Sequence, residues 1–254
     1  MFFKHIVFLL CLVGFLGINK PAIANNKPLR IAVAANFAPV LKQLLPEFEQ
    51  QYQVKIQVIS SATGVLFQQI NHGAPFDIFL SADSMRPKLL EQKQLIIPHS
   101  RKTYAVGELA LYSAIKADFT LNDLKALPQS QQRFAIANAK TAPYGKAAKE
   151  SLMYLQLWQP LQKKLITGMN VGQTFQQVRS KAVYAGIVAH SQLKLNQLQG
   201  QLLPKNSYQP ILQQLVILKS SQNLKLAQRF VLFLLSPISQ KKIALLGYQT
   251  VDTR

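Results

Sequence analysis

The stretch IAVAANFAPVLKQLL (31–45) predicts a buried strand that runs directly into a helix. Extended to LRIAVAA (29–35), its first part is a run of apolar, small and β-branched residues, which is typical of a strand covered on both faces. The next segment, APVLKQLLPEFEQQY (38–52), has a helical period, with Pro39 in its first turn and Pro46 at an expected kink. Asn36 stands at the junction, where its amide can cap the helix or donate outward.

The same alternation of strand and helix continues along the chain. Two more strands are predicted at VKIQVIS (54–60) and DIFLSAD (77–83), with a short helix at GVLFQQINHG (64–73) between them. Further strands are expected at 108–114, 133–139, 185–190 and 211–220, and helices at 120–127, 144–158, 171–183 and 224–247, the last around Pro237. Such alternation predicts an α/β fold of parallel sheets with helices on both faces. In these folds the ligand lies beyond the carboxyl ends of the strands, at helix starts.

The first 24 residues have the features of a secretory signal. MFFKHIVFLLCLVGFLGINKPAIA (1–24) has Lys4 near its start, an apolar stretch over 6–18 and a final small-residue pattern, so cleavage is expected after Ala24. The apolar stretch is shorter than the roughly 20 residues that a retained membrane anchor needs. The only cysteine, Cys11, lies inside this segment, so the exported chain is expected to fold without disulfides.

The composition is strongly basic, with 29 Lys and Arg against 10 Asp and Glu. Only Lys4 and Lys20 of these basic residues lie in the signal, and the others are dispersed singly or in pairs. The sequence contains neither a basic arm nor an aromatic ribonucleoprotein motif. We therefore expect a solvated basic surface, which also raises the local concentration of small anions, and no binding of nucleic acid.

Three further junctions share the uncharged, polar character of the one at Asn36. They are SSATG (60–64), NAKTAPYG (138–145) and MNVGQ (169–173), and each opens a predicted helix. Helix N-termini carry free N–H groups and a dipole that favours negative charge. Four such junctions therefore predict converging donors for an anion.

The residue types of an enzyme active site are present but not suitably spaced. The histidines are scattered, without helix-face or metal-ligand spacing, at positions 5, 72, 99 and 190. Asp77 and Asp83 would lie about 20 Å apart along an extended strand. Asp83 is expected to cap the following turn, and FVLFLL (230–235) to pack in the core. A phosphate loop with lysine and a GxSxG motif are both missing from the sequence, so we expect no enzymatic activity.

Six motifs follow one another from about Leu29 to the end of the chain: AANF, GAPFDIFLSAD (73–83), TAPYGKAA, NVGQ, AGIV and FLLSPISQKKIALLGY. In these motifs and their order the chain resembles the periplasmic molybdate-binding proteins of ABC transporters. The most specific marker is GAPFDIFLSAD, which is close to the family's GAP-x-D-hydrophobic-F-x-SAD run. The resemblance implies a two-lobed type II periplasmic binding protein fold, each lobe a mostly parallel sheet covered by helices, with the ligand in the interlobe cleft.

The resemblance also implies which residues meet the oxyanion: Ala35, Asn36, Thr63, Tyr144 and Val171. Much of this contact is expected through backbone N–H groups, with no direct bond to the metal and no cofactor. Thr63 stands where the family more often has Ser, and Ala189 where one branch has a Tyr that contacts the ligand. Thr63 also has a purely structural interpretation as a helix cap, and Tyr144 one as a cover for the hinge.

Together these features predict an exported, monomeric periplasmic protein that captures molybdate, and also tungstate, and delivers it to an inner-membrane ABC permease. Lobe 1 is expected to comprise 28–105 plus 207–254 and lobe 2 to comprise 106–206, since the chain should cross near TYAVGEL (103–109) and LLPKNSYQP (202–210). A binding protein for another small oxyanion, such as sulfate or phosphate, is one alternative. An exported protein that binds nucleic acid or another polyanion is the other.

Overall fold

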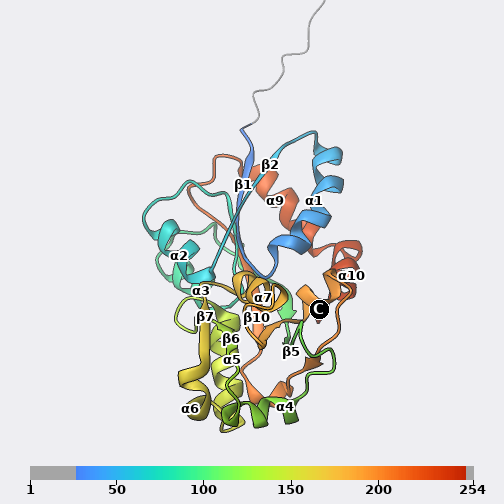
Figure 1. Ribbon diagram of the computed structural model, residues 1–254. Helices are drawn as coiled ribbons and strands as arrows, with labels where there is room; N and C mark the ends of the chain where they lie inside the picture. The colour runs from blue at the N-terminus through green and yellow to red at the C-terminus, as the bar shows by residue number, and fades with distance from the viewer. Residues whose placement is uncertain (1–26, 250–254) are drawn as a thin grey trace, which may run out of the picture.

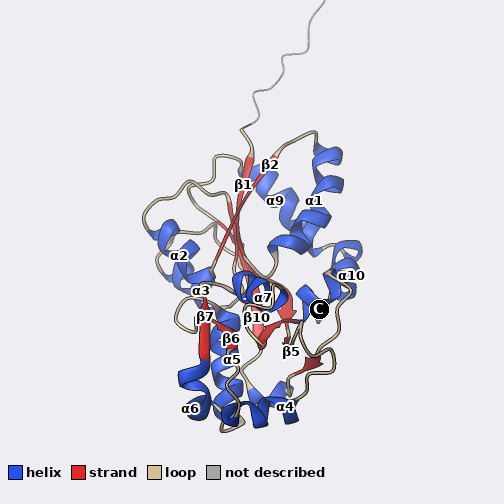
Figure 2. Cartoon of the chain, viewed as in Figure 1, coloured by secondary structure: helices blue, strands red, loops and turns tan. Residues whose placement is uncertain are grey.

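The computed structural model of the protein describes residues 27–249, which form two α/β lobes, one above the other in Figure 1. The signal expected at 1–24 and the last part of lobe 1, 250–254, lie outside the described residues. Each lobe is built on a five-stranded sheet, and Figure 2 shows helices packed around both sheets. Among the helices of residues 27–249, none has the length and apolar character needed to cross a bilayer.

Lobe 1 is the part of the protein built on the sheet with strand order β2-β1-β3-β10-β4. These strands are β1 (Leu29–Ala34), β2 (Ile56–Ser61), β3 (Ile78–Leu80), β4 (Lys102–Gly107) and β10 (Ile211–Ile217). One face, which carries Ile31 and Val33, is covered by α1 (Ala38–Tyr52), α9 (Leu224–Leu235) and α10 (Pro237–Leu245). The other face, which carries Ala32, is covered by α2 (Thr63–Asn71) and α3 (Met85–Gln92). Both faces of β1 are therefore buried, which explains its continuous apolar run.

Lobe 2 is the part built on the sheet with strand order β7-β6-β8-β5-β9. These strands are β5 (Leu109–Tyr112), β6 (Phe134–Ala137), β7 (Leu165–Gly168), β8 (Ala185–Ala189) and β9 (Gln201–Leu202). One face packs against α4 (Leu121–Ala126), α5 (Pro143–Tyr154) and α6 (Trp158–Leu161), and the other against α7 (Val171–Arg179) and α8 (His190–Leu195). Three short 3₁₀ turns complete the described chain: η1 (Leu127–Gln129), η2 (Gln162–Lys164) and η3 (Lys205–Ser207).

The α/β fold predicted from the sequence is confirmed, and three adjacent strands at one side of each sheet run parallel. β1 pairs in parallel with β2 and β3, and β6 does so with β7 and β8. The remaining pairings are antiparallel, because β10 opposes β3 and β4, and β5 opposes β8 and β9. The chain leaves lobe 1 along β4 and returns along β10, so these two neighbours must run in opposite directions. The sequence pattern did not contain this information.

The chain crosses between the lobes after β4 and again between β9 and β10. Val106 and Gly107, which the sequence analysis assigned to lobe 2, pair with Leu212 and Ile211 of β10 in the sheet of lobe 1. Ladder hydrogen bonding to β10 therefore extends β4 by two residues beyond the expected boundary at 105.

Two predicted helices end differently from the expectation. The segment 224–247 forms two helices, because Ser236 is extended and its hydroxyl accepts a hydrogen bond from Ser239 N at the start of α10. The segment 144–158 is interrupted after Tyr154 by a turn in which Gln156 has a φ of 59°. By contrast, α1 is one continuous helix with Pro46 inside it, at an exposed position.

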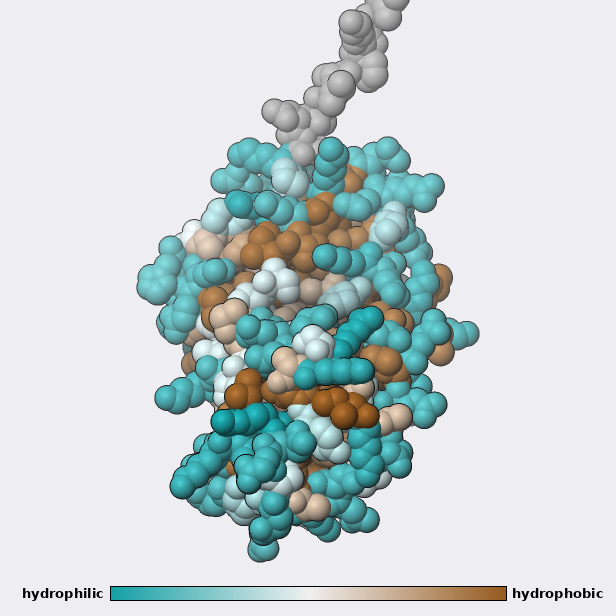
Figure 3. Space-filling view, in the orientation of Figure 1, coloured by the Kyte–Doolittle hydropathy of each residue, from teal (hydrophilic) through white to brown (hydrophobic). Residues whose placement is uncertain are grey.

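The apolar segment 230–235 packs its inner side in the core, as predicted. Phe230 and Leu234 are fully buried, whereas Leu232 is 72% exposed. Figure 3 shows hydrophilic side chains over most of the visible face, with apolar side chains in separate patches. This surface agrees with the expected solvated exterior.

The buried carboxylate of Asp77 holds the start of β1 to the C-terminal segment of lobe 1. It accepts hydrogen bonds from Arg30 N at 2.7 Å, from Ser221 Oγ at 2.7 Å and from Asn223 Nδ2 at 3.3 Å. We expect Asp77→Ala to lower the free energy of unfolding by about 2–3 kcal/mol, because these donors lose a charged acceptor. The measurement is denaturant unfolding, with Asp118→Ala at an exposed position as the control. Equal stability of the two variants would contradict a structural role for Asp77.

Candidate functional site

Four strand-to-helix junctions meet at one small cavity between the lobes. Lobe 1 contributes the ends of β1 and β2, and lobe 2 contributes the starts of α5 and α7. The space in which the centre of a water molecule could move is about 10 Å³. The wall consists of Ala34, Ala35, Asn36, Ala62, Thr63, Ala82, Ala142, Pro143, Tyr144 and Val171. All five residues that the resemblance implied thus lie around a single point, although they span more than half of the chain.

Backbone N–H groups are the main donors at this cavity. Among the described residues, Asn36, Thr63, Tyr144 and Val171, one at each junction, have a backbone N–H group without a protein acceptor. Three of these four are in the first turns of α2, α5 and α7, where an α-helix leaves its N–H groups unpaired. An anion can satisfy such groups and interacts favourably with the helix dipoles.

Ala35 lines the cavity but does not have a free N–H group. Its N–H donates to the carbonyl of Ser61 at 3.0 Å, which continues the pairing of β1 with β2. The donor that this junction offers is therefore the N–H of Asn36, one residue later. Ala35 contributes only its small side chain and its backbone to the wall.

The side chain of Asn36 neither caps α1 nor faces outward, so both interpretations from the sequence are wrong. The N-cap residue is Phe37, and it has no side-chain cap. The Asn36 amide is 1% exposed and donates to Gln213 Oε1 at 2.8 Å and to Tyr248 Oη at 3.1 Å. Both of its N–H bonds are thus used inside the protein, and the backbone of Asn36 is held in place.

Gln213 is the centre of a buried polar network that the sequence analysis missed. It lies in β10 with 0% exposure, and its Oε1 also accepts from Tyr104 Oη at 3.1 Å. Its Nε2 donates to Tyr144 Oη at 3.2 Å. The network thereby joins Asn36 in lobe 1 to Tyr144 in lobe 2 through a strand that connects the lobes. The available signal was the polar pair QQ within the apolar run ILQQLVIL (211–218).

Tyr248 extends this network toward α8. Its hydroxyl donates to the carbonyl of Asn36 at 3.0 Å and accepts from Ser191 Oγ at 3.2 Å. Burial raises the pKa of Tyr248 to about 12 and raises the pKa of Tyr104 and Tyr144 well above the usual value. These phenols stay neutral near pH 7, and none of the lining residues carries a charged side chain. The site is therefore uncharged.

Tyr144 lies both at the cavity and at the connection between the lobes. Its backbone N–H lies at the cavity, while its phenol reaches into the hinge beside Gly107. A Cβ atom at Gly107 would overlap the Tyr144 hydroxyl, so a glycine is needed there. Tyr144 therefore links the cavity directly to a strand between the lobes.

Thr63 is buried at the start of α2 but does not cap that helix. The N-cap residue is Ala62, and Thr63 Oγ1 instead accepts a hydrogen bond from Ala82 N at 3.2 Å. Its hydroxyl hydrogen remains available as a donor at the cavity wall.

Val171 follows Asn170, whose side chain caps α7 by accepting from Gln173 N at 3.0 Å.

Several other candidates from the sequence lie away from the cavity. Ala189 is buried and bonded through its N–H to Gln192 Oε1, but it is not among the lining residues. Asp83 caps the turn before α3, as predicted, by accepting from Arg86 N at 3.0 Å. Within residues 27–249, no group of three His, Cys, Asp or Glu side chains is arranged to hold a metal ion.

A two-lobed α/β fold with a small, uncharged and donor-rich cavity between its lobes defines a binding protein for a small solute. The sequence model of the bacterial extracellular solute-binding proteins matches residues 29–249, and the chain belongs to this family. It is therefore a binding protein and not an enzyme.

Two relatives and one solved structure are similar to this chain over nearly its whole length. The molybdate-binding protein ModA of Azotobacter vinelandii is 36% identical over 230 residues, covering 89% of this chain and 91% of the relative. The molybdate-binding protein ModA of Rhodobacter capsulatus is 34% identical over 238 residues, 92% of each chain. The solved structure of the periplasmic molybdate-binding protein of Azotobacter vinelandii matches with a TM-score of 0.83 and 33% identity, covering 88% of this chain and all of that one.

We expect Asn36→Asp to destabilise the protein, because a buried carboxylate would face the acceptor oxygen of Gln213. The expected loss in unfolding free energy at pH 7 is at least about 2 kcal/mol. Denaturant unfolding without ligand measures it, and Asn206→Asp, at an exposed position, is the matched control. If both variants were as stable as the parent, the Asn36 amide would not be committed to the network.

Proposed function

We propose that this protein is the periplasmic binding component of an ABC transporter, that it captures molybdate, and that it delivers this oxyanion to the membrane permease. The observation that carries the proposal is the convergence of four N–H groups without protein acceptors on one small, uncharged cavity. The relatives that are 36% and 34% identical and named as molybdate-binding proteins support it.

A neutral site suits a tetrahedral dianion for a physical reason. Burial removes the hydration shell of the anion, and donors in fixed positions must replace it. Hydrogen bonds to a charged acceptor contribute roughly 1.5–3 kcal/mol each, so a handful of them can support tight binding without a buried cation. The distance from donor to centre then selects anions by size. Tungstate has the same charge and shape as molybdate, and we propose that it also binds.

The remaining parts of the proposal concern transport. Residues 1–24 would direct export to the periplasm, where the chain would act as a monomer. We keep the expected lobes, 28–105 plus 207–254 and 106–206, as the bodies that move relative to each other, with 106 and 107 transferred to lobe 1. The permease would recognise the form in which the lobes are together.

Titration of the purified protein tests the ligand class. We expect molybdate and tungstate to stabilise the protein against thermal unfolding, by about 2.7 kcal/mol at 100 times the dissociation constant. Sulfate and phosphate should have much smaller effects, and raised salt should leave molybdate binding nearly unchanged because a buried site is screened little. A stronger response to sulfate or phosphate would assign the site to another oxyanion. Salt-sensitive binding of single-stranded DNA would favour a polyanion-binding protein instead.

The hydroxyl of Thr63 provides a second test of the same site. Thr63→Val should weaken molybdate binding by about 1–3 kcal/mol, because an oxygen of the buried anion loses its donor. Thr63→Ser keeps the donor and should bind like the parent. The variants are compared by calorimetric titration.

A matched control separates ligand binding from stability at this position. Thr63→Val also removes the acceptor of Ala82 N, so its unfolding free energy should fall. Thr174→Val removes another buried threonine hydrogen bond, to the carbonyl of Asn170 at 3.1 Å, and Thr174 does not line the cavity. Thr174→Val should therefore lower stability but keep the molybdate affinity. An unchanged affinity in Thr63→Val would remove the Thr63 hydroxyl from the site.

A further inference from the structure

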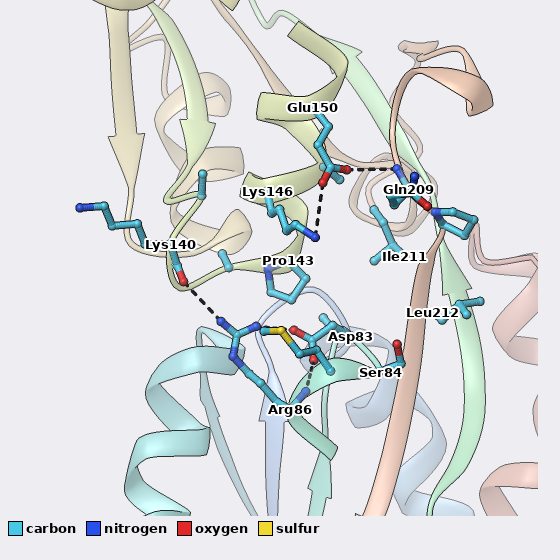
Figure 4. A pocket seen from close by; sticks show the side chains of 16 residues that line it. Asp83, Ser84, Arg86, Lys140, Pro143, Lys146, Glu150, Gln209, Ile211 and Leu212 are labelled. Carbon is cyan, nitrogen blue, oxygen red and sulfur yellow. Dashed lines mark hydrogen bonds and ion pairs between the residues drawn. The ribbon is translucent and has the colours of Figure 1, made fainter. Parts of the chain in front are cut away.

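A groove of about 520 Å³ adjoins the small cavity on one side of the cleft. It shares Ala82, Ala142 and Pro143 with the wall of the cavity. Figure 4 shows that α5 of lobe 2 and the start of α3 of lobe 1 face each other across this groove. Hydrogen bonds join the two lobes at this groove, and their donors are different from the N–H groups at the cavity.

Two donors of lobe 1 bond to two consecutive carbonyls of lobe 2. Gly64 N, in the first turn of α2, donates to the carbonyl of Thr141 at 2.9 Å. Arg86 Nη2 donates to the carbonyl of Lys140 at 3.3 Å, as drawn in Figure 4. Both acceptors lie directly before the segment that carries the N–H group of Tyr144. We call Gly64, Arg86 and these two carbonyls the interlobe latch.

The Arg86 guanidinium is held in position within lobe 1. It forms an ion pair with Asp83, and the two side chains are only 12% and 19% exposed. The Asp83 carboxylate is itself fixed by Ser81 Oγ at 3.0 Å and by Arg86 N. The donor is therefore pre-organised, so little entropy is lost when it meets lobe 2.

The acceptor loop is equally constrained within lobe 2. Asn138 Oδ1 accepts from Lys140 N at 2.9 Å, and the Asn138 carbonyl accepts from Ala142 N at 2.9 Å. A displacement of this loop must therefore carry the start of α5, with the N–H group of Tyr144, away from the cavity. The contact at the latch is therefore coupled to the position of the Tyr144 N–H group at the cavity.

The absence of a side chain at Gly64 is required for this contact. A Cβ atom there would lie 2.9 Å from the carbonyl oxygen of Thr141 and 3.1 Å from both Arg86 Nη2 and Thr141 Cα. The nearest of these atoms is backbone of the opposite lobe, which can yield only by moving apart. Gly64 therefore limits how closely α2 approaches lobe 2.

We propose that Gly64 and Arg86 are positioning residues that set how long the bound oxyanion is retained, because their bonds to lobe 2 hold the lobes together over the cavity. This inference rests on the proposed function, since the retained ligand is the oxyanion of that site. None of the four latch residues lines the cavity, so the latch acts on dissociation and not on recognition.

Binding kinetics of two variants test the latch. The probe is whichever of molybdate, tungstate, sulfate and phosphate stabilises the wild-type protein most in a thermal melt. Arg86→Lys keeps a cation beside Asp83 but loses the second guanidinium nitrogen, and Gly64→Ala blocks the approach. We expect each to raise the dissociation constant about 2- to 10-fold, mainly through faster dissociation, with an association rate near that of the parent.

Two control variants keep the latch and each remove one nearby cation. In Figure 4 the side chain of Lys140 points away from the groove, so Lys140→Ala leaves the accepting carbonyl in place. Within residues 27–249 Lys146 pairs with Glu150 of its own helix alone, at 3.4 Å, and Lys146→Ala removes a groove cation without touching the latch. Both controls should dissociate at the wild-type rate.

The outcomes are distinct. Unchanged dissociation in both latch variants, with normal binding by the wild type, overturns the latch and leaves the proposed function standing. A larger effect in the lysine controls than in Arg86→Lys also overturns it, because groove charge would then be the determinant. Strongest wild-type stabilisation by sulfate or phosphate overturns the proposed ligand but still permits the latch test. A wild-type protein that none of the four oxyanions stabilises overturns both.

Discussion

The meeting of four strand-to-helix junctions at one uncharged cavity is the constraint on which the rest of this structure depends. One helix start offers only a few N–H groups, and they diverge from the helix end. Four of them can surround one point only if the carboxyl ends of strands in two different sheets face each other. The two sheets, their three parallel strands each and the double crossing of the chain all meet this requirement.

The connection between the lobes is part of the binding site. Tyr144 offers its N–H to the cavity, and its phenol is packed at Gly107 and bonded to Gln213, both on connecting strands. Gln213 in turn holds Asn36 on the opposite lobe. A movement of the lobes cannot leave the donor positions unchanged, because the same buried network spans the hinge and both walls of the cavity.

Charged residues are distributed differently over the whole chain and at the cavity. The excess of basic residues is spread over the chain, whereas no charged side chain lines the cavity. A diffuse positive field attracts anions of any kind, but it cannot distinguish among them. Fixed neutral donors can do so, because their positions define one size of ligand. Asp83 and Arg86 form an ion pair in the groove beside the cavity, and Arg86 also takes part in the contact between the lobes.

The sequence alone predicted most elements of the fold, but not β4, β7, β9, α3, α6 or α8, and it named five of the residues that line the cavity. Hydrophobic periodicity predicted β1 and α1 nearly to the residue, because both depend on local pattern. The motifs around Asn36, Thr63, Tyr144 and Val171 identified the four junctions. The tertiary structure decided the antiparallel course of β10, the commitment of the Asn36 amide to Gln213, the bond of Ala35 to Ser61 and the meeting of Gly64 with Thr141. Each of these joins residues far apart in the chain, and local sequence does not record which distant partner takes a given donor.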